Sequence, residues 1–161
     1  MTRGMLTLLF TFVAGAIVGR VSIPSAGSQL AELGVVHAQT HKPLFMTRLY
    51  TGPDNQTHAE EVEINFTTPG EVSKMIQVTG AELHRAPAGR VSDWHRGPRR
   101  QYVITLSGRG ELEIAGGKKI PIEPGHIELI EDTSGKGHIT RVVGTEDRVT
   151  LYLPLADQSG R

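Results

Sequence analysis

Three side chains of this sequence are best suited to chemistry: the imidazoles of His95 and His138 and the amide of Gln101 between them. A neutral imidazole can move a proton near pH 7 or ligate a divalent metal ion, and an amide oxygen is an uncharged acceptor. The chain has 7 His and no Cys, which excludes a thiolate zinc site, a cysteine nucleophile and a disulfide scaffold. Any site is therefore built from imidazole, amide, carboxylate and guanidinium groups.

Glycines frame the first of these histidines at regular distances. Five residues separate Gly89 from His95, and Gly97 follows two positions later. Three residues then precede Gln101, and six more lead to Gly108. This spacing resembles the first motif of the cupin family, small jelly-roll barrels whose motif has histidine at the position of Gly97 and glutamate at that of Gln101.

A second proline–glycine turn precedes the second histidine. Pro124-Gly125 is followed by a strand-like run and then by His138, in an order that resembles the second cupin motif. His126 stands where that motif commonly has aspartate, and the turn before His138 is longer than usual. The resemblance covers residues 72–153 and implies a jelly-roll barrel that often forms homodimers.

The resemblance also implies a metal site, and two of its ligand positions are changed here. Residues two apart in a strand face the same side, so the family motif directs its ligands into the barrel. His95, Gln101 and His138 would then hold a divalent iron, manganese, nickel or zinc ion. The alternative is that no metal is bound and the histidines contact a ligand directly. Both alternatives remain open at this point.

Neighbouring side chains extend the predicted cavity. Arg99 can form paired hydrogen bonds with a carboxylate if it points inward, and Trp94 can stack on a flat or sugar-like ligand at the mouth. The alternatives are a solvated charge and a packing residue at the rim. Glu131 and Asp132 open the turn before His138, and we expect an exposed acidic turn rather than a pair sharing a proton.

Two functions are consistent with these residues. The first is a barrel that binds a small molecule in a cavity centred on His95 and His138. The second is a metal-dependent enzyme of the oxygenase, isomerase or lyase type acting on a small organic acid or sugar, with the same two histidines as candidate catalytic residues.

The composition and the absence of several known motifs exclude further functional classes. With 17 Lys+Arg and 17 Asp+Glu, the chain lacks the basic excess that phosphate neutralisation requires, so we expect no nucleic-acid partner. No phosphate-binding loop, dinucleotide fingerprint or nucleophile elbow occurs.

The pattern after residue 39 predicts an all-β domain over residues 39–161. Short runs rich in β-branched and aromatic residues alternate with Gly and Pro turns, which favours a single antiparallel jelly-roll barrel. The predicted strands are Leu44–Tyr50, Glu61–Phe66, Val72–Val78, Ala81–Arg85, Gln101–Leu106, Glu111–Ala115, Lys118–Ile122, His126–Ile130, His138–Val143 and Val149–Leu153. Gly52–Ala59, with His58, is predicted to be a loop.

Residues 1–38 have a different composition and predict export or anchoring. Met5–Gly19 has no charged residue and lies between Arg3 and Arg20, as in a secretory signal. Val36-His37-Ala38 offers a cleavage site before Gln39, although it lies far from the apolar run. The segment is therefore a cleaved signal peptide or a retained membrane anchor, which places the domain in the periplasm, outside the cell or at a membrane. A buried core helix is the other alternative.

Overall fold

The computed structural model describes residues 42–67 and 71–159. The predictions of a signal peptide or membrane anchor at residues 1–38, and of a domain boundary at residue 39, lie outside the described residues. Within the described part, no helix is long and apolar enough to cross a membrane.

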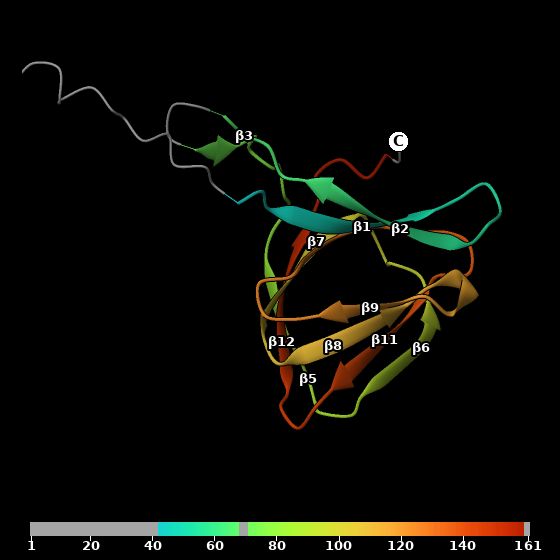
Figure 1. Ribbon diagram of the computed structural model, residues 1–161. Helices are drawn as coiled ribbons and strands as arrows, with labels where there is room; N and C mark the ends of the chain where they lie inside the picture. Colours follow the sequence, from blue (N-terminus) through green and yellow to red (C-terminus); the bar gives the residue numbers. More distant parts are fainter. Residues whose placement is uncertain (1–41, 68–70, 160–161) are drawn as a thin grey trace, which may run out of the picture. The chain divides into compact units, whose positions relative to one another are not determined.

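Two sheets make up the barrel (Figure 1). The first has six strands in the order β2 (Thr57–Glu63), β1 (Phe45–Thr51), β10 (Ile127–Glu131), β7 (Gln101–Ser107), β12 (Arg148–Pro154) and β5 (Glu82–Ala86). The second has four strands in the order β6 (Val91–His95), β11 (His138–Val143), β8 (Arg109–Glu113) and β9 (Lys119–Ile122). A separate pair, β3 (Phe66–Thr67) and β4 (Val72–Ser73), and a 3₁₀ turn, Ala115–Gly117, complete the elements.

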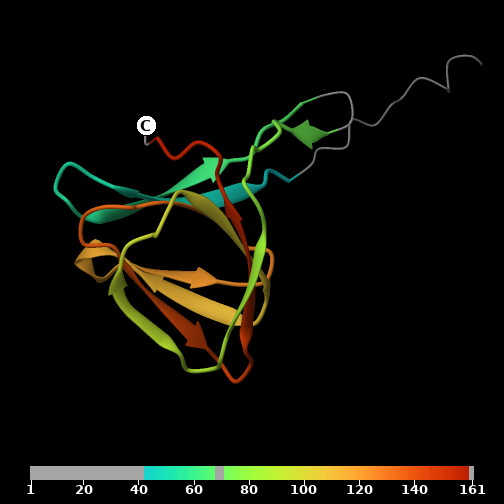
Figure 2. The ribbon, with the colours of Figure 1, turned by 180° about the vertical axis from the view of Figure 1, so that it is seen from behind.

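From β5 to β12 the chain crosses between the two sheets at every connection except the one from β8 to β9, which pair within the four-stranded sheet (Figure 2). This winding gives the jelly-roll barrel that the sequence predicts, and the all-β prediction is confirmed for the described residues. One pairing departs from the antiparallel expectation, because β1 and β10 run parallel.

The strand predictions fail in four places. The predicted strand Glu61–Phe66 is broken, because β2 ends at Glu63 and β3 begins at Phe66. The sequence reading missed β6, which carries His95 and consists mostly of polar residues. The predicted strand Val72–Val78 shrinks to the two residues of β4 and a single bridge from Val78 to Leu155. The predicted loop Gly52–Ala59 ends early, since β2 begins at Thr57 and places His58 opposite Tyr50 in β1. Pairing with a neighbouring strand thus overrides weak local preferences.

The inner face of the six-stranded sheet is unusually polar. In β7 the buried residues are Gln101, Val103 and Thr105, while Tyr102 and Ile104 between them are only half-buried. The buried polar residues of this sheet are Thr47, Thr57, Gln101, Thr105, Glu128, Arg148 and Thr150. An apolar cluster fills the rest of the interior: Leu49, Val103, Leu112, Ile114, Ile122 and Ile130. A barrel interior that is partly apolar and partly polar has the composition of a ligand cavity.

Candidate functional site

His95 and His138 lie side by side in the four-stranded sheet. The antiparallel register of β6 and β11 pairs them directly, and their ring centroids are 4.5 Å apart at an interplanar angle of 57°. Gly137 permits this approach, because its φ of +80° is left-handed and a Cβ there would overlap the main-chain carbonyl of His95. The local sequence before β11 therefore fixes the spacing of the two imidazoles.

A buried carboxylate orients the His138 ring. Its Nδ1 is 2.6 Å from Oδ2 of Asp132, and the hydroxyl of Thr57 donates to the same oxygen at 2.9 Å. Asp132 is fully buried and His138 is 4% exposed. Because a carboxylate oxygen accepts, Nδ1 of His138 carries a proton, and Nε2 is the ring nitrogen left to contact a ligand.

A main-chain carbonyl orients the His95 ring in the same way. Nδ1 of His95 donates to the carbonyl oxygen of Asp93 at 2.7 Å, which again leaves Nε2 as the free ring nitrogen. Burial lowers the pKa of His95, and the nearby His138 and Arg90 lower it further, against the hydrogen bond to Asp93 and the charge of Asp132. The lowered pKa favours the neutral form of His95, whose Nε2 can accept a hydrogen bond from a ligand.

Both rings line a cavity of about 280 Å³ that continues into a second space of about 270 Å³ between β5 and β6. Polar side chains from both sheets surround the rings: His84, Arg90, Ser92, Gln101, Glu128, Thr140, Arg148 and Tyr152. Within this wall the rings of His84 and Tyr152 stack at 4.0 Å between centroids.

Positive and negative side chains are paired in the deep part of the cavity, whereas its open side is positively charged. Nη2 of the buried Arg148 lies 2.7 Å from Oε1 of Glu128, and its Nε and Nη2 both donate to the hydroxyl of Thr105. Arg90 and Arg85 are exposed, line the second space, and have no ion pair with any described carboxylate. The unneutralised charge of the cavity is therefore cationic.

The structure brings Gln101 into the cavity but not Trp94 or Arg99. Gln101 is buried in the cavity wall, and its Oε1 accepts a hydrogen bond from Nε of Arg99 at 3.1 Å. Arg99 lies outside the lining and also donates to Glu82 at 2.8 Å. Trp94 is 36% exposed and lies under Lys136, whose Nζ is 3.9 Å from the ring centroid. Arg99 and Trp94 therefore contact other side chains, and their contacts with a ligand stay predictions.

The residues present do not fit the metal site that the resemblance implies. No group of three or more His, Asp or Glu side chains suited to a metal occurs in the described ranges. The amide oxygen of Gln101 already accepts from Arg99. Position 97 has no room for the family's second histidine, because a Cβ on Gly97 would overlap the side chain of Ile130. Two imidazole nitrogens remain, which is half of the implied ligand set.

Sequence reasoning missed the residues that support the two histidines. The expectation of an exposed acidic turn at Glu131 and Asp132 was wrong, since Asp132 is fully buried against His138 and Glu131 pairs with Arg48 and Arg100. Arg48 and Arg100 are distant from Glu131 in the sequence, and Asp132, although only six residues from His138, lies in a turn that the sequence predicts to be exposed. Glu128 did carry a signal, because a charged residue inside an apolar strand indicates a polar interior.

Comparisons with known proteins found similar solved structures and no matching family. No protein-family model matches the chain, and no curated protein matches it. Three similar solved structures are a cupin domain from Bordetella pertussis (18% identity, 52% of this chain and 91% of that one, TM-score 0.40), the cupin domain of Schizosaccharomyces pombe Cnp3 (14%, 73% and 86%, 0.42) and a cupin-2 domain from Rhodospirillum rubrum (19%, 76% and 77%, 0.38). All three are cupin domains, and at these TM-scores the likeness carries no conclusion about the activity of this chain.

Proposed function

We propose that the barrel binds a small organic acid in the cavity that contains His95 and His138. The observation that carries this proposal is the anchoring of both Nδ1 atoms, which leaves the Nε2 atoms of two neighbouring rings to contact a ligand in one cavity. Two fixed acceptors can receive a hydroxyl or protonated carboxyl group of a ligand, and their fixed orientation reduces the entropy lost on binding.

The charge of the cavity favours an acid over a neutral sugar. The buried Arg148 is neutralised by Glu128, whereas Arg90 on the open side has no described carboxylate partner. A ligand carboxylate can therefore contact Arg90 without competing with a protein anion. The cavity of about 280 Å³ is near the lower end of the roughly 300–1,000 Å³ common for drug-sized ligands, which favours a small molecule.

Proton transfer is the second candidate function. A buried carboxylate on Nδ1 holds an imidazole in the tautomer of a general base, and Asp132 stands in that relation to His138. His95 beside it offers a second proton acceptor within the same cavity. The metal-dependent alternative has less support, because the donor set falls short of the family's ligands.

An NMR titration tests the binding proposal. Histidine ring signals of the protein are followed while succinate, citrate or galacturonate is added, with glucose as the neutral probe. We expect an acid to shift the ring signals of His95 and His138, and His138→Gln to weaken its binding at least tenfold. His58→Gln is the matched control, since His58 pairs with Asp54 away from the cavity.

Three results would contradict the proposal. The first is that no acid moves either ring, and the second is that His138→Gln binds as tightly as the unchanged protein. The third is stoichiometric metal in the purified protein that both His95→Gln and His138→Gln remove, which would favour the enzyme alternative.

A further inference from the structure

The outer face of the six-stranded sheet carries apolar side chains, which reverses the usual polarity of a sheet with one face towards solvent. In β7 the outward residues are Tyr102 and Ile104, which alternate with residues of the cavity wall. The apolar side chains of this outer face are Met46, Val62, Tyr102, Ile104, Ile127, Leu129 and Leu153. They do not line the cavity that contains His95 and His138, so the outer face is a separate surface.

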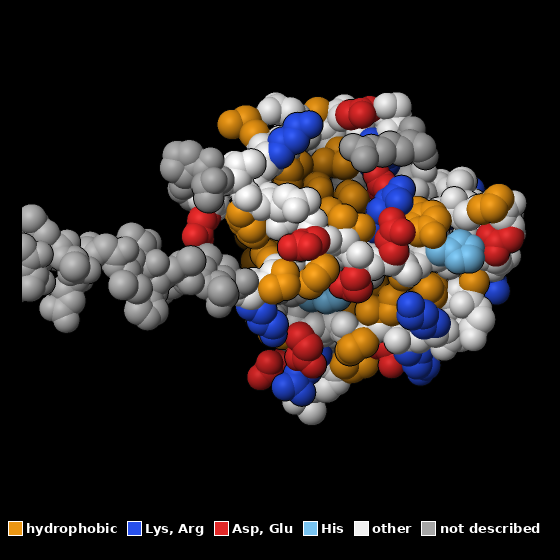
Figure 3. Space-filling model, turned by 45° about the horizontal axis from the view of Figure 1, so that its top comes forward, with side chains coloured by type: hydrophobic (Ala, Val, Ile, Leu, Met, Phe, Trp, Pro, Cys, Tyr) orange, Lys and Arg blue, Asp and Glu red, His pale blue; other side chains and the backbone are white. Residues whose placement is uncertain are grey.

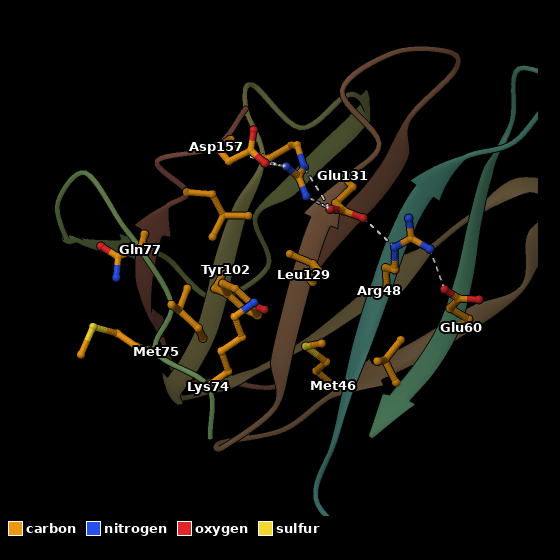
Figure 4. Close-up of a pocket in the computed structure, with 14 residues that line it drawn as sticks. Met46, Arg48, Glu60, Lys74, Met75, Gln77, Tyr102, Leu129, Glu131 and Asp157 are labelled. Carbon is orange, nitrogen blue, oxygen red and sulfur yellow. Dashed lines mark hydrogen bonds and ion pairs between the residues drawn. The ribbon is translucent and has the colours of Figure 1, made fainter. Parts of the chain in front are cut away.

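Two adjoining hollows shape the outer face. The first, of about 730 Å³, has Met46, Tyr102 and Leu129 on its floor, and Figure 4 shows Arg48 and Lys74 on either side of that floor. The second, of about 590 Å³, lies between the sheet and the segment that contains β3 and β4. In the space-filling view hydrophobic side chains surround a hollow, and acidic and basic side chains lie along its rim (Figure 3).

The two hollows form one continuous groove, which we call the outer groove. Along β10, Glu131 lies in the first hollow and Ile127 in the second, about 14 Å apart at about 3.4 Å per residue. Each hollow falls within the roughly 300–1,000 Å³ common for ligand pockets. The lining residues that the two hollows share are Met46, Lys74, Met75, Ile76 and Tyr102.

The outer groove suits an alkyl chain better than a peptide. Its floor is a face of the sheet, where main-chain N–H and C=O groups are already paired between strands. A peptide on this face would find no main-chain partners for its own amide groups, whereas an alkyl chain needs none. The side chains of Met46 and Met75 are flexible and adapt to apolar ligands of different length.

The arginines beside the first hollow are already paired with carboxylates. Arg48 contacts Glu60 at 2.7 Å and Glu131 at 2.6 Å, and Arg100 contacts the same Glu131. Burial alone would raise the pKa of Glu131, but the hydrogen bonds from Arg100 and Arg48 lower it below its ordinary value. Lys74, by contrast, is exposed and has no ion pair with a carboxylate of the described residues.

The position of this lysine decides how an amphipathic ligand lies in the outer groove. Lys74 borders both hollows, whereas Glu63 is exposed and borders only the second. An anionic head group is therefore attracted by Lys74 and repelled from the second hollow by Glu63. The apolar tail then lies over Ile104, Ile127 and Leu153 on the floor of the second hollow.

We propose that the outer groove binds a medium- or long-chain fatty acid, with its carboxylate at Lys74 and its alkyl chain over the outer face of the sheet. The carboxylate complements the charge of the lysine, and the chain covers an apolar surface that otherwise faces water. The ligand is a single free molecule, because a flat bilayer surface would leave the two hollows unfilled. This site is distinct from the histidine cavity and does not depend on the function proposed for it.

Calorimetric titration of the purified full chain with octanoate and dodecanoate, both below their micelle concentrations, tests the proposal. Burial of one methylene tightens binding about fourfold, so even half-burial of the four extra methylenes gives more than about tenfold. We therefore expect dodecanoate to bind at least tenfold more tightly than octanoate. Equal affinities, or no binding of either acid, would overturn the proposal.

Substitutions of the head-group contact locate the carboxylate. We expect Lys74→Gln to weaken the binding of dodecanoate at least fivefold. Lys118→Gln is the matched control and should change nothing, because Lys118 is an exposed lysine just before β9 in the other sheet. Equal effects of these two substitutions would show that the lysine charge acts only in general, which contradicts a carboxylate at Lys74.

Substitutions of the floor locate the alkyl chain. We expect Ile104→Gln and Met75→Gln to weaken the binding of dodecanoate, Ile104→Gln at least tenfold, and Val143→Gln to have no effect. Val143 is an apolar residue of β11 in the other sheet and is 38% exposed. Met75 is 80% exposed, so its substitution leaves the barrel interior undisturbed if Ile104→Gln fails to fold. Unchanged binding by Met75→Gln and by a folded Ile104→Gln would overturn the proposal.

Two further measurements separate the outer groove from other sites. Dodecanoate should leave the ring signals of His95 and His138 in place, and His138→Gln should bind it as tightly as the unchanged protein does. Shifted ring signals would overturn the proposal in favour of the histidine cavity. Binding to phosphatidylglycerol vesicles that Lys74→Gln abolishes, without binding of free dodecanoate, would overturn it in favour of a membrane surface.

Discussion

Replacing Asp132 by alanine tests whether this buried carboxylate holds His138 ready for a ligand. The substitution removes the acceptor of two buried groups, the hydroxyl of Thr57 and the Nδ1–H of His138. A buried donor left unsatisfied costs about 1–3 kcal/mol, and a lost hydrogen bond to a charged group costs about 1.5–3 kcal/mol. Removing a carboxylate whose Oδ1 has no hydrogen-bond partner offsets part of that loss. We therefore expect a decrease of about 3 kcal/mol in the free energy of unfolding, a large part of the roughly 5–15 kcal/mol typical of a domain.

The same substitution should also change the His138 tautomer. Without Asp132 no described group accepts from Nδ1, so the proton moves to Nε2 and the lone pair that faces the cavity is lost. Urea unfolding followed through Trp94, the chain's 1 Trp, measures the stability, and ring nitrogen chemical shifts report the tautomer. Binding of an organic acid should weaken in parallel, because the acceptor has become a donor.

Thr57→Val is the control for this experiment. It removes the hydroxyl while keeping the shape of the side chain, and it leaves the contact between Asp132 and His138 in place. We expect a loss of about 1 kcal/mol and no change of tautomer. The reasoning is refuted if Asp132→Ala unfolds within about 0.5 kcal/mol of the unchanged protein and His138 keeps its proton on Nδ1.

Three further predictions concern the cavity and its frame. Glu128→Ala leaves the buried Arg148 without its ion-pair partner and should lower the free energy of unfolding in urea by about 3–5 kcal/mol. The double variant Glu128→Leu with Arg148→Met should lose less, and equal losses in the two variants would contradict this reasoning. Because burial lowers the pKa of folded His95, the unfolded chain takes up its proton first as the pH falls. The stability that neutral His95 provides is therefore complete above about pH 6.5 and is lost at lower pH. We expect the melting temperature of His95→Gln to depend less on pH between pH 7 and 5 than that of the unchanged protein. If the melting temperature of His95→Gln falls as steeply with pH as that of the unchanged protein, the lowered pKa of His95 is contradicted. Gly137→Ala should lower the free energy of unfolding by at least about 2–3 kcal/mol, because the new Cβ overlaps the His95 main chain and the left-handed backbone adds strain of roughly 1–2 kcal/mol. Gly144 is also left-handed but has open space around it, so Gly144→Ala should show the backbone strain alone.

The sequence was sufficient to predict the class of fold and the pair of histidines. Glycine and proline turns between short β-branched runs require many short strands, and the two-residue period of a strand separates Gln101 from Tyr102. The spacing from Gly89 to Gly108 singled out His95 and Gln101 as site residues, although no strand was predicted at β6, which bears His95. These properties are local, so the type of a residue and its neighbours along the chain are enough to predict them.

Only the tertiary structure decided which face of each strand is interior and what supports the site. A period of two shows that Gln101 and Tyr102 face opposite ways, but the polar set lies inside here, against the usual rule. Thr57 reaches Asp132 from 75 residues away, and Arg48 reaches Glu131 from 83 residues away, through contacts between segments that only folding brings together. A carboxylate is buried only where such a partner meets it, because the cost of desolvation is offset by a hydrogen bond that the local sequence does not contain.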